Sequence, residues 1–206
     1  MSTTPGSPGL PAFIQFGRNH EANTDGYVYI YFIRVEDPSR WDVQAPGVMW
    51  LARAPAAGEA FTDRSTWEWV VDLDASHNPT WGDEASRVPV LEDPDGFMRS
   101  SAMYNPGLDR YLLVTNHTAR NHGNIAIWEA PKPWGPWNVV LKESGWPGSD
   151  PSAPPESELS RTFAFGNFSP KWLSADGRQC VFVWFRPDRW NSVACRFLVA
   201  GDRADR

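Results

Sequence analysis

Leu51-Ala52-Arg53-Ala54-Pro55 and Ile127-Trp128-Glu129-Ala130-Pro131 are two copies of one pattern, and this repeat decides the fold. The first copy precedes the Trp-led segment 69–73, and the second precedes the Trp-led segment 137–141. Both read as an apolar strand, an Ala-Pro turn and a further strand. We therefore interpret this pair of strands as part of a repeated unit.

More strand candidates lie upstream of these pairs. One set is aromatic and β-branched, follows turns rich in Asp, Asn, Gly or Pro, and covers residues 26–33, 110–115 and 180–185. Another set precedes those turns and covers residues 12–17, 98–105 and 163–172. The unit is thus four antiparallel strands. Two copies are complete, and the third ends after its third strand, at residues 190–199.

Repeated four-stranded antiparallel units are typical of a β-propeller. We predict an all-β chain with about two and a half to three blades, and a β-sandwich is the alternative fold. Because a propeller needs roughly four to eight blades, we expect missing N-terminal blades or a second chain to close the ring. The predicted organisation is a flexible lead (1–11), a partial propeller domain (12–200) and a tail (201–206).

Composition excludes several classes of function. The 206 residues include 19 Lys or Arg and 25 Asp or Glu, for a net charge of −6, and no basic stripe suits nucleic acid. No apolar run approaches the ~20 residues of a membrane helix. The N-terminus has no basic region followed by an apolar one, so it does not read as a secretory signal. The compartment stays open, and we expect a secreted or cell-envelope protein if an upstream segment is missing.

The two cysteines, Cys180 and Cys195, fall on neighbouring strand candidates. If residues 186–189 form a four-residue loop, Phe185 faces Trp190 and the antiparallel register places Cys180 opposite Cys195. A cross-strand disulfide is then geometrically possible. The alternative is a pair of buried free thiols.

An ordered set of short motifs resembles the C-terminal part of bacterial proteins that carry the domain of unknown function numbered 4185. The motifs are Phe16-Gly17-Arg18-Asn19-His20-Glu21, Asp25-Gly26-Tyr27-Val28-Tyr29, Leu51-Ala52-Arg53-Ala54-Pro55, Arg110-Tyr111-Leu112-Leu113, residues 129–137, residues 167–177 and Trp190-Asn191. That family is similar to five-bladed propeller glycosidases and includes endo-acting D-arabinanases. The resemblance covers residues 13 to 199. It implies a five-bladed propeller when intact and a glycoside hydrolase that acts on a polysaccharide.

Glycoside hydrolysis needs two carboxyl groups, one on either side of the scissile bond. Glu21 lies in the polar loop 18–25, and Asp25 directly precedes a strand. His117 follows a strand and could move a proton. These three are our catalytic candidates. The alternatives are that Glu21 is a solvated loop residue, that Asp25 only stabilises a turn, and that His117 only packs in its loop. No carboxylate pair is assigned, no organic cofactor or metal set is expected, and a structural calcium ion near His20 stays open.

The inner strand candidates carry polar residues that would face a channel. The substrate-binding candidates on them are Arg99, Ser101, Tyr104, Asn105, Asn167, Ser169 and Lys171. Trp190, beside a loop, could stack on the apolar face of a sugar. The alternative for the polar residues is a water-filled axial channel. The remaining prominent tryptophans fall on predicted strands, where we expect packing between blades: Trp69, Trp128, Trp137 and Trp172.

Overall fold

The computed structural model describes residues 6–37, 39, 42–118, 124–144, 165–186 and 189–199. Among them it contains strands and short 3-10 turns but no α-helix, and no helix long and apolar enough to cross a membrane. The strands are β1 (Ser7–Phe16), β2 (Tyr27–Val35), β3 (Gly47–Pro55), β4 (Glu68–Leu73), β5 (Pro79–Gly82), β6 (Leu91–Asp93), β7 (Ser100–Asn105), β8 (Arg110–Asn116), β9 (Ile125–Ala130), β10 (Asn138–Glu143), β11 (Phe165–Phe168), β12 (Gln179–Arg186) and β13 (Arg189–Arg196).

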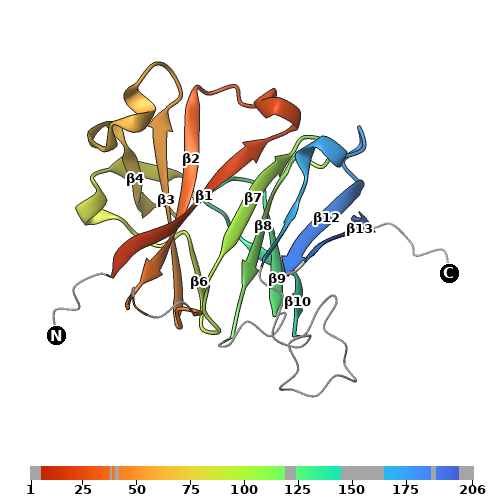
Figure 1. Ribbon diagram of the computed structural model, residues 1–206. Coiled ribbons are helices and arrows are strands. Elements are labelled where there is room, and N and C mark those ends of the chain that lie inside the picture. Colours follow the sequence, from red (N-terminus) through yellow and green to blue (C-terminus); the bar gives the residue numbers. More distant parts are fainter. Residues whose placement is uncertain are drawn as a thin grey trace.

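The predicted four-stranded units are present as propeller blades. The first blade is β1-β2-β3-β4 and the second is β7-β8-β9-β10, each with antiparallel neighbours. The third blade is the antiparallel sheet β11-β12-β13. Figure 1 shows the three units following one another from left to right, with β1 and β7 toward the viewer and β10 behind. The arrangement is all-β and is that of consecutive blades, not of a two-sheet sandwich.

Apolar side chains fill the spaces between the blades. One cluster joins strands of the first and second blades, and its fully buried members include Tyr31, Leu51 and Leu113. Another joins the second and third blades, through residues such as Ile125 and Phe182. Both faces of the second blade are therefore covered, which explains why β8 is a nearly continuous apolar run in the sequence.

The far face of the first blade is also buried, although no further blade stands against it among the described residues. Trp69 is 1% exposed there, and its neighbours come from β2 and β3. The guanidinium carbon of Arg87 lies 4.2 Å from the ring centroid of Trp50. Phe61, in the connection between β3 and β4, packs against Trp67 with 6.4 Å between ring centroids. This connection and Arg87 thus cover part of the apolar face.

Three features differ from the predictions. β1 begins at Ser7 rather than at residue 12, because residues 7–9 pair with β2 before a register shift. β1 also pairs in parallel with β7, so the first two blades share one sheet. The long connection after β4 carries two added strands, β5 beside β4 and β6 beside β3. The predicted lead up to residue 5, the connection 145–164 and the tail 201–206 lie outside the described residues.

The register of the third blade agrees with the sequence prediction, although the predicted loop 186–189 is wrong, because Arg186 and Arg189 are themselves paired strand residues. Phe185 pairs with Trp190, and Cys180 pairs with Cys195. Both thiols are free, and the Cys180 Sγ lies 3.8 Å from the Cys195 carbonyl oxygen. Burial, together with the neighbouring Cys195, raises the pKa of Cys180 to about 12. The free-thiol alternative is the state that the structure contains.

Candidate functional site

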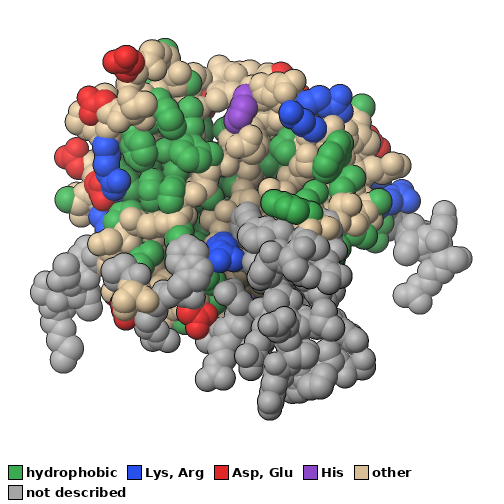
Figure 2. All heavy atoms as spheres, viewed as in Figure 1, with side chains coloured by type: hydrophobic (Ala, Val, Ile, Leu, Met, Phe, Trp, Pro, Cys, Tyr) green, Lys and Arg blue, Asp and Glu red, His purple; other side chains and the backbone are tan. Residues whose placement is uncertain are grey.

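The inner strands of the three blades border one cavity, which we call the axial hollow. It has a volume of about 350 Å³ and lies among β1, β7 and β11. Polar and apolar groups both reach it. Its lining includes Phe13, Gln15, Ser100, Ser101, Met103, Asn167, Ser169 and Pro170. Figure 2 looks onto the face formed by the inner strands, where hydrophobic side chains gather over the first blade and basic side chains lie near the upper right.

Two serines of β7 border the axial hollow, and only the hydroxyl of Ser101 lies on the same strand face as Met103 and Asn105. Ser101 Oγ donates a hydrogen bond to the Gly166 carbonyl oxygen at 3.2 Å, which ties β7 to the third blade. Ser100 Oγ is buried and has no hydrogen-bond partner among the described residues. Buried hydroxyl groups are generally paired with protein or with water.

The third blade contributes two further polar residues. Asn167 is exposed and Ser169 is partly buried, and both line the axial hollow. From the first blade, Phe13 and Gln15 are exposed while their strand neighbours Ala12, Ile14 and Phe16 are buried. The sequence analysis missed Phe13, Gln15 and Ser100. The alternation of exposed and buried positions along β1 was the signal that could have found the first two.

Asn105 and Tyr104 do not line the axial hollow. Asn105 is fully buried, and its Nδ2 donates to the Gly177 carbonyl oxygen at 2.8 Å, which joins two blade-end turns. Tyr104 packs against Phe16 and donates from its hydroxyl to Asp109 at 2.8 Å. Burial and that carboxylate raise the pKa of Tyr104. Both residues hold the blades in place in this structure, and their proposed contact with substrate stays a prediction.

Asp25 occupies a turn at the start of β2. It accepts hydrogen bonds from the Tyr27 backbone N–H at 3.0 Å and from the Tyr29 hydroxyl at 2.7 Å. Burial raises the pKa of Tyr29 well above its ordinary value, and the hydrogen bond to Asp25 raises it further. The geometry is that of a turn Asp, the alternative given by the sequence. Its catalytic role stays a prediction.

Glu21 follows the 3-10 turn η1 (Arg18–His20), at the upper end of β1. Its Oε1 accepts a hydrogen bond from the Arg18 backbone N–H at 2.7 Å. Both residues are exposed. Glu21 thus stands at one end of the inner strands, beyond the axial hollow rather than inside it.

His117 is buried, and both of its ring nitrogens have neighbours. Nδ1 lies 2.9 Å from Thr118 Oγ1, and Nε2 lies 3.2 Å from the Glu143 carbonyl oxygen. A proton-transfer role would require one of these contacts to open. Arg99, next to β7, is partly buried, and burial lowers its pKa. Neither residue is among those that line the axial hollow.

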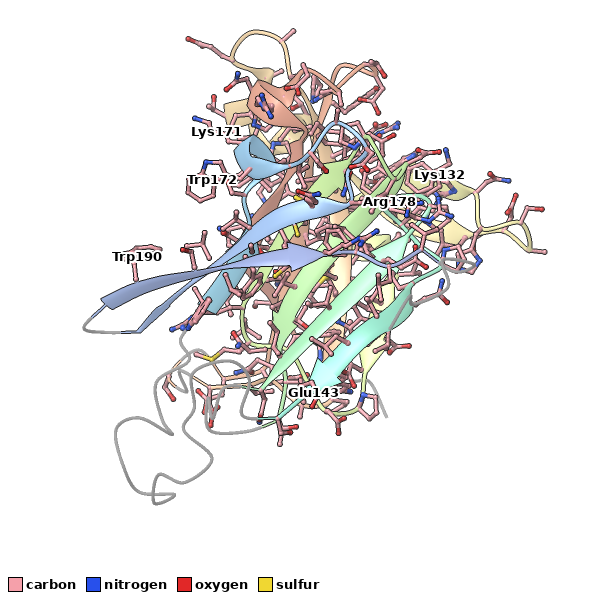
Figure 3. The ribbon with its side chains drawn as sticks, turned by 90° about the vertical axis from the view of Figure 1, so that its right-hand side faces the viewer. Lys132, Glu143, Lys171, Trp172, Arg178 and Trp190 are labelled. Atoms are coloured by element: carbon pink, nitrogen blue, oxygen red, sulfur yellow. The ribbon has the colours of Figure 1, made fainter. Side chains whose placement is uncertain are left out.

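Lys171 and Trp172 belong to the 3-10 turn η5 (Pro170–Trp172), and Trp190 lies on β13. Figure 3 shows all three projecting toward the side of the molecule that faces the viewer in Figure 1. Trp172 is 56% exposed and Trp190 is 76% exposed. The expected packing role is therefore wrong for Trp172, since η5 ends the strand and turns its ring outward. Trp128 is buried between the first and second blades, as expected, whereas Trp69 is buried on the far face of the first blade, against which no described blade packs.

A partly buried charge cluster that joins the first and second blades was not predicted. Lys142 Nζ on β10 lies 2.8 Å from Asp93 Oδ1 and 2.7 Å from Asp95 Oδ2. The side chain of Asp93 is only 1% exposed. Partial burial lowers the pKa of Lys142, but hydrogen bonds to Asp93 and Asp95 outweigh it, so its pKa is raised. The separation of these residues along the chain hides the cluster from sequence reasoning.

No group of three or more His, Cys, Asp or Glu side chains is placed to hold a metal ion within the described ranges. His20, Glu21 and Asp25 therefore do not form such a group here. Of the described residues that line the axial hollow, none carries a carboxylate. The arrangement offers hydrogen bonds and apolar contact to a neutral polar ligand, and it does not by itself supply the two carboxyl groups of glycoside hydrolysis.

Comparison with known proteins places the fold. No protein-family model matches the sequence, and no curated protein matches it. Among solved structures, an exo-beta-1,3-galactanase from Clostridium thermocellum is 12% identical with a TM-score of 0.52, covering 91% of this chain and 34% of that one. A family 117 glycoside hydrolase from Zobellia galactanivorans is 13% identical with a TM-score of 0.44, covering 91% of this chain and 51% of that one.

An endo-arabinase from Bacteroides thetaiotaomicron is 15% identical with a TM-score of 0.41, covering 95% of this chain and 55% of that one. The chain thus spans about a third of the galactanase and about half of the other two proteins. The likeness to the galactanase at this level of identity shows the fold alone. This chain consists of blades of the β-propeller found in such glycoside hydrolases.

Proposed function

We propose that this chain binds an oligosaccharide or polysaccharide in the axial hollow. The observation that carries the proposal is a cavity of about 350 Å³, bordered by three inner strands and lined by the polar side chains of Gln15, Ser101 and Asn167. Ligand pockets generally measure about 300–1,000 Å³ and combine apolar walls with a few polar groups. The volume and mixed lining of the axial hollow support a small sugar unit as occupant.

The lining groups suit the chemistry of a sugar. Ser101, Asn167 and Gln15 can donate hydrogen bonds to the hydroxyl groups of a sugar and accept hydrogen bonds from them. The ring of Phe13 is 40% exposed and can contact the apolar face of a pyranose or furanose. The exposed rings of Trp172 and Trp190 lie on the same side of the molecule.

We further propose that the whole protein is a glycoside hydrolase that acts on a polysaccharide by carboxylate acid/base chemistry. The fold that this chain shares with a galactanase supports it, as does the resemblance of its sequence motifs to a family that includes endo-acting D-arabinanases. A closed propeller would require further blades, either upstream in the same chain or from a second chain. Those blades would supply carboxyl groups to act with Glu21 or Asp25, and His117 would assist proton transfer.

A second candidate function is carbohydrate binding without hydrolysis. It is favoured by the lining of the axial hollow, whose described residues include no Asp or Glu. The two candidates share the binding site and differ in turnover. Binding and cleavage are therefore measured separately.

The test uses β-1,3-galacto-oligosaccharides and arabino-oligosaccharides with isothermal titration calorimetry. We expect Asn167→Ala and Ser101→Ala to weaken binding about fivefold or more, since each removes a hydrogen-bonding group from the axial hollow. The matched control is Asn138→Ala on the outer strand β10, whose amide bonds to Glu129 rather than to the hollow. Equal affinities for all three variants and the wild type would place sugar binding outside the axial hollow. If the wild type bound neither the galacto-oligosaccharides nor the arabino-oligosaccharides, the proposal would be refuted.

Hydrolysis is tested on the same sugars by the release of reducing ends. Turnover by the chain or by its longer parent would support the hydrolase. Binding without product from the parent protein, across galactan and arabinan, would favour the non-catalytic candidate.

A further inference from the structure

A second hollow lies above the axial hollow. It also measures about 350 Å³, and we call it the upper hollow. Its lining includes Arg18, Glu21, Pro106, Pro170 and Ser174. The upper hollow has a charged rim, whereas the described lining of the axial hollow carries no charged side chain.

The two hollows follow one another along the same three segments of the chain. On the first segment the lining passes from Gln15 to Arg18, and on the second from Met103 to Pro106. On the third segment Pro170 borders both hollows. The two hollows are therefore neighbours along β1, β7 and the β11–η5 segment, and we call the pair the groove.

The groove is longer than one sugar ring. At about 3.3 Å per residue, the β7 segment from Ser100, in the axial hollow, to Asn105, at the upper hollow, spans roughly 17 Å. A ligand that uses both hollows must therefore be an oligomer.

The floor of the upper hollow is fixed by close contact between two turns. Asn105 and Gly107 line the hollow, and a Cβ added at Gly107 would lie 2.2 Å from the Gly177 backbone nitrogen. The Asn105 side chain bonds the Gly177 carbonyl oxygen. Only a glycine permits this approach of the two backbones. The hollow is thus formed before any ligand arrives, which lowers the entropic cost of binding.

The charged rim is also held in place. The Arg18 backbone N–H donates to Glu21 Oε1 at 2.7 Å, and the Arg18 guanidinium donates to the Leu173 carbonyl oxygen at 3.3 Å. The second bond links η1 of the first blade to the segment after η5 in the third. A carboxylate accepts hydrogen bonds from vicinal hydroxyl groups, and a guanidinium donates to ring and hydroxyl oxygens.

We propose that the upper hollow is a second sugar-binding subsite, so that the chain binds an oligosaccharide along the groove with Glu21 and Arg18 contacting its far end. The inference rests on the proposed function, because the first sugar unit occupies the axial hollow. It assigns to Glu21 a role in binding, at a distance from the axial hollow.

The test compares affinity across oligosaccharide length. β-1,3-galacto-oligosaccharides and arabino-oligosaccharides, from disaccharide to hexasaccharide, are titrated by calorimetry into the full chain. We expect affinity to rise with length until both hollows are filled and then to level off. Glu21→Gln should weaken the longer ligands by about tenfold and the disaccharide by less than twofold, because it removes a charge-assisted bond only at the upper hollow.

A second variant works by filling space. Ala175 lines the upper hollow and is exposed, so Ala175→Leu should reduce its volume without disturbing the core. It should also weaken only the longer ligands. Glu59→Gln is the matched control for charge, since Glu59 is exposed in the connection between β3 and β4 and borders neither hollow.

Affinity that is the same from disaccharide to hexasaccharide would overturn the second subsite and leave the axial hollow as a sugar site. Unchanged binding of long ligands by Glu21→Gln and Ala175→Leu would do the same. If no oligosaccharide of any length binds, the proposed function and the subsite are both overturned.

Discussion

Replacing Lys142 by Met would leave a buried carboxylate without its cation. Lys142 Nζ lies 2.8 and 2.9 Å from the two carboxylate oxygens of Asp93, whose side chain is 1% exposed. Asp93 ends β6 beside the first blade, while Lys142 lies on β10 of the second. The pair therefore links two blades, and removing the lysine exposes the full cost of burying the Asp93 charge.

The magnitude follows from burial. Breaking a buried ion pair at one partner costs about 3–5 kcal/mol. Because the Lys142 side chain is 26% exposed, water replaces part of the lost interaction, and we expect Lys142→Met to cost about 2–3 kcal/mol. With an m value of about 2 kcal/mol/M, the urea midpoint should fall by roughly 1 M.

Two further variants test the reasoning. Asp95 is 54% exposed, so Asp95→Asn should cost less than about 1 kcal/mol although it removes a bond to the same lysine. The double variant Asp93→Asn/Lys142→Met removes both buried charges and should be more stable than the sum of the single changes predicts, by about 1 kcal/mol or more. A fall in the urea midpoint of less than about 0.3 M for Lys142→Met, or strict additivity in the double variant, would refute this account.

The same cluster predicts a dependence on pH. The hydrogen bond from Lys142 holds the pKa of Asp95 below its usual 3.8. A carboxyl group with a lowered pKa stabilises the folded chain at pH values above its unfolded pKa, and this contribution is lost as pH falls through the folded pKa. In Lys142→Met the pKa of Asp95, measured by carbon NMR, should return toward its usual value. An unchanged pKa would mean that the lysine does not control it.

Other expected outcomes concern strain, exposure and reactivity. Gly177→Ala should be more destabilising in urea than Gly26→Ala, which costs about 1 kcal/mol. Both residues have positive φ, but only at Gly177 would the added Cβ meet neighbouring atoms, at 2.1 Å from Asn105 Oδ1. Trp172→Ala should change stability by less than about 0.5 kcal/mol, whereas Trp69→Ala should cost about 3–5 kcal/mol; similar losses would contradict the outward placement of Trp172. Iodoacetamide at pH 8 should modify Cys180 at least tenfold more slowly in the folded chain than in urea, given its raised pKa and burial; equal rates would be inconsistent with a buried thiol.

The repeat and its local pairing were predictable because they depend on neighbours in sequence. The short distance along the chain between β12 and β13 limits the register that places Cys180 opposite Cys195. The parallel contact of β1 with β7 was not predictable, since Ile14 and Ala102 are paired through the packing of two blades and not by a shared turn. The β6 strand was missed for a similar reason, because its partner β3 lies far upstream.

The alternation of side chains along the strands predicted only some of the residues that line the axial hollow. Period 2 identifies which residues share a face of β7, but it does not say how deeply each one is buried or what covers it. Ser101 reaches the axial hollow, whereas Asn105, on the same strand, is buried against the Gly177 turn. Tyr104 belongs to the opposite face, where it packs on Phe16. Gln15 was missed because its strand was predicted as an element without its exposed positions being assigned.

Under the proposed function, sugar binding and sugar cleavage have different requirements in the two hollows. Hydrolysis requires two carboxyl groups about 5–9.5 Å apart across the scissile bond. Of the described residues that line either hollow, Glu21 alone carries a carboxylate, and it borders the upper one. A cleavage site that used Glu21 would therefore need its partner carboxylate from another part of the protein, at the upper end of the groove. Binding by the axial hollow requires no such partner, so it should persist in Glu21→Gln even if cleavage by the longer protein is lost.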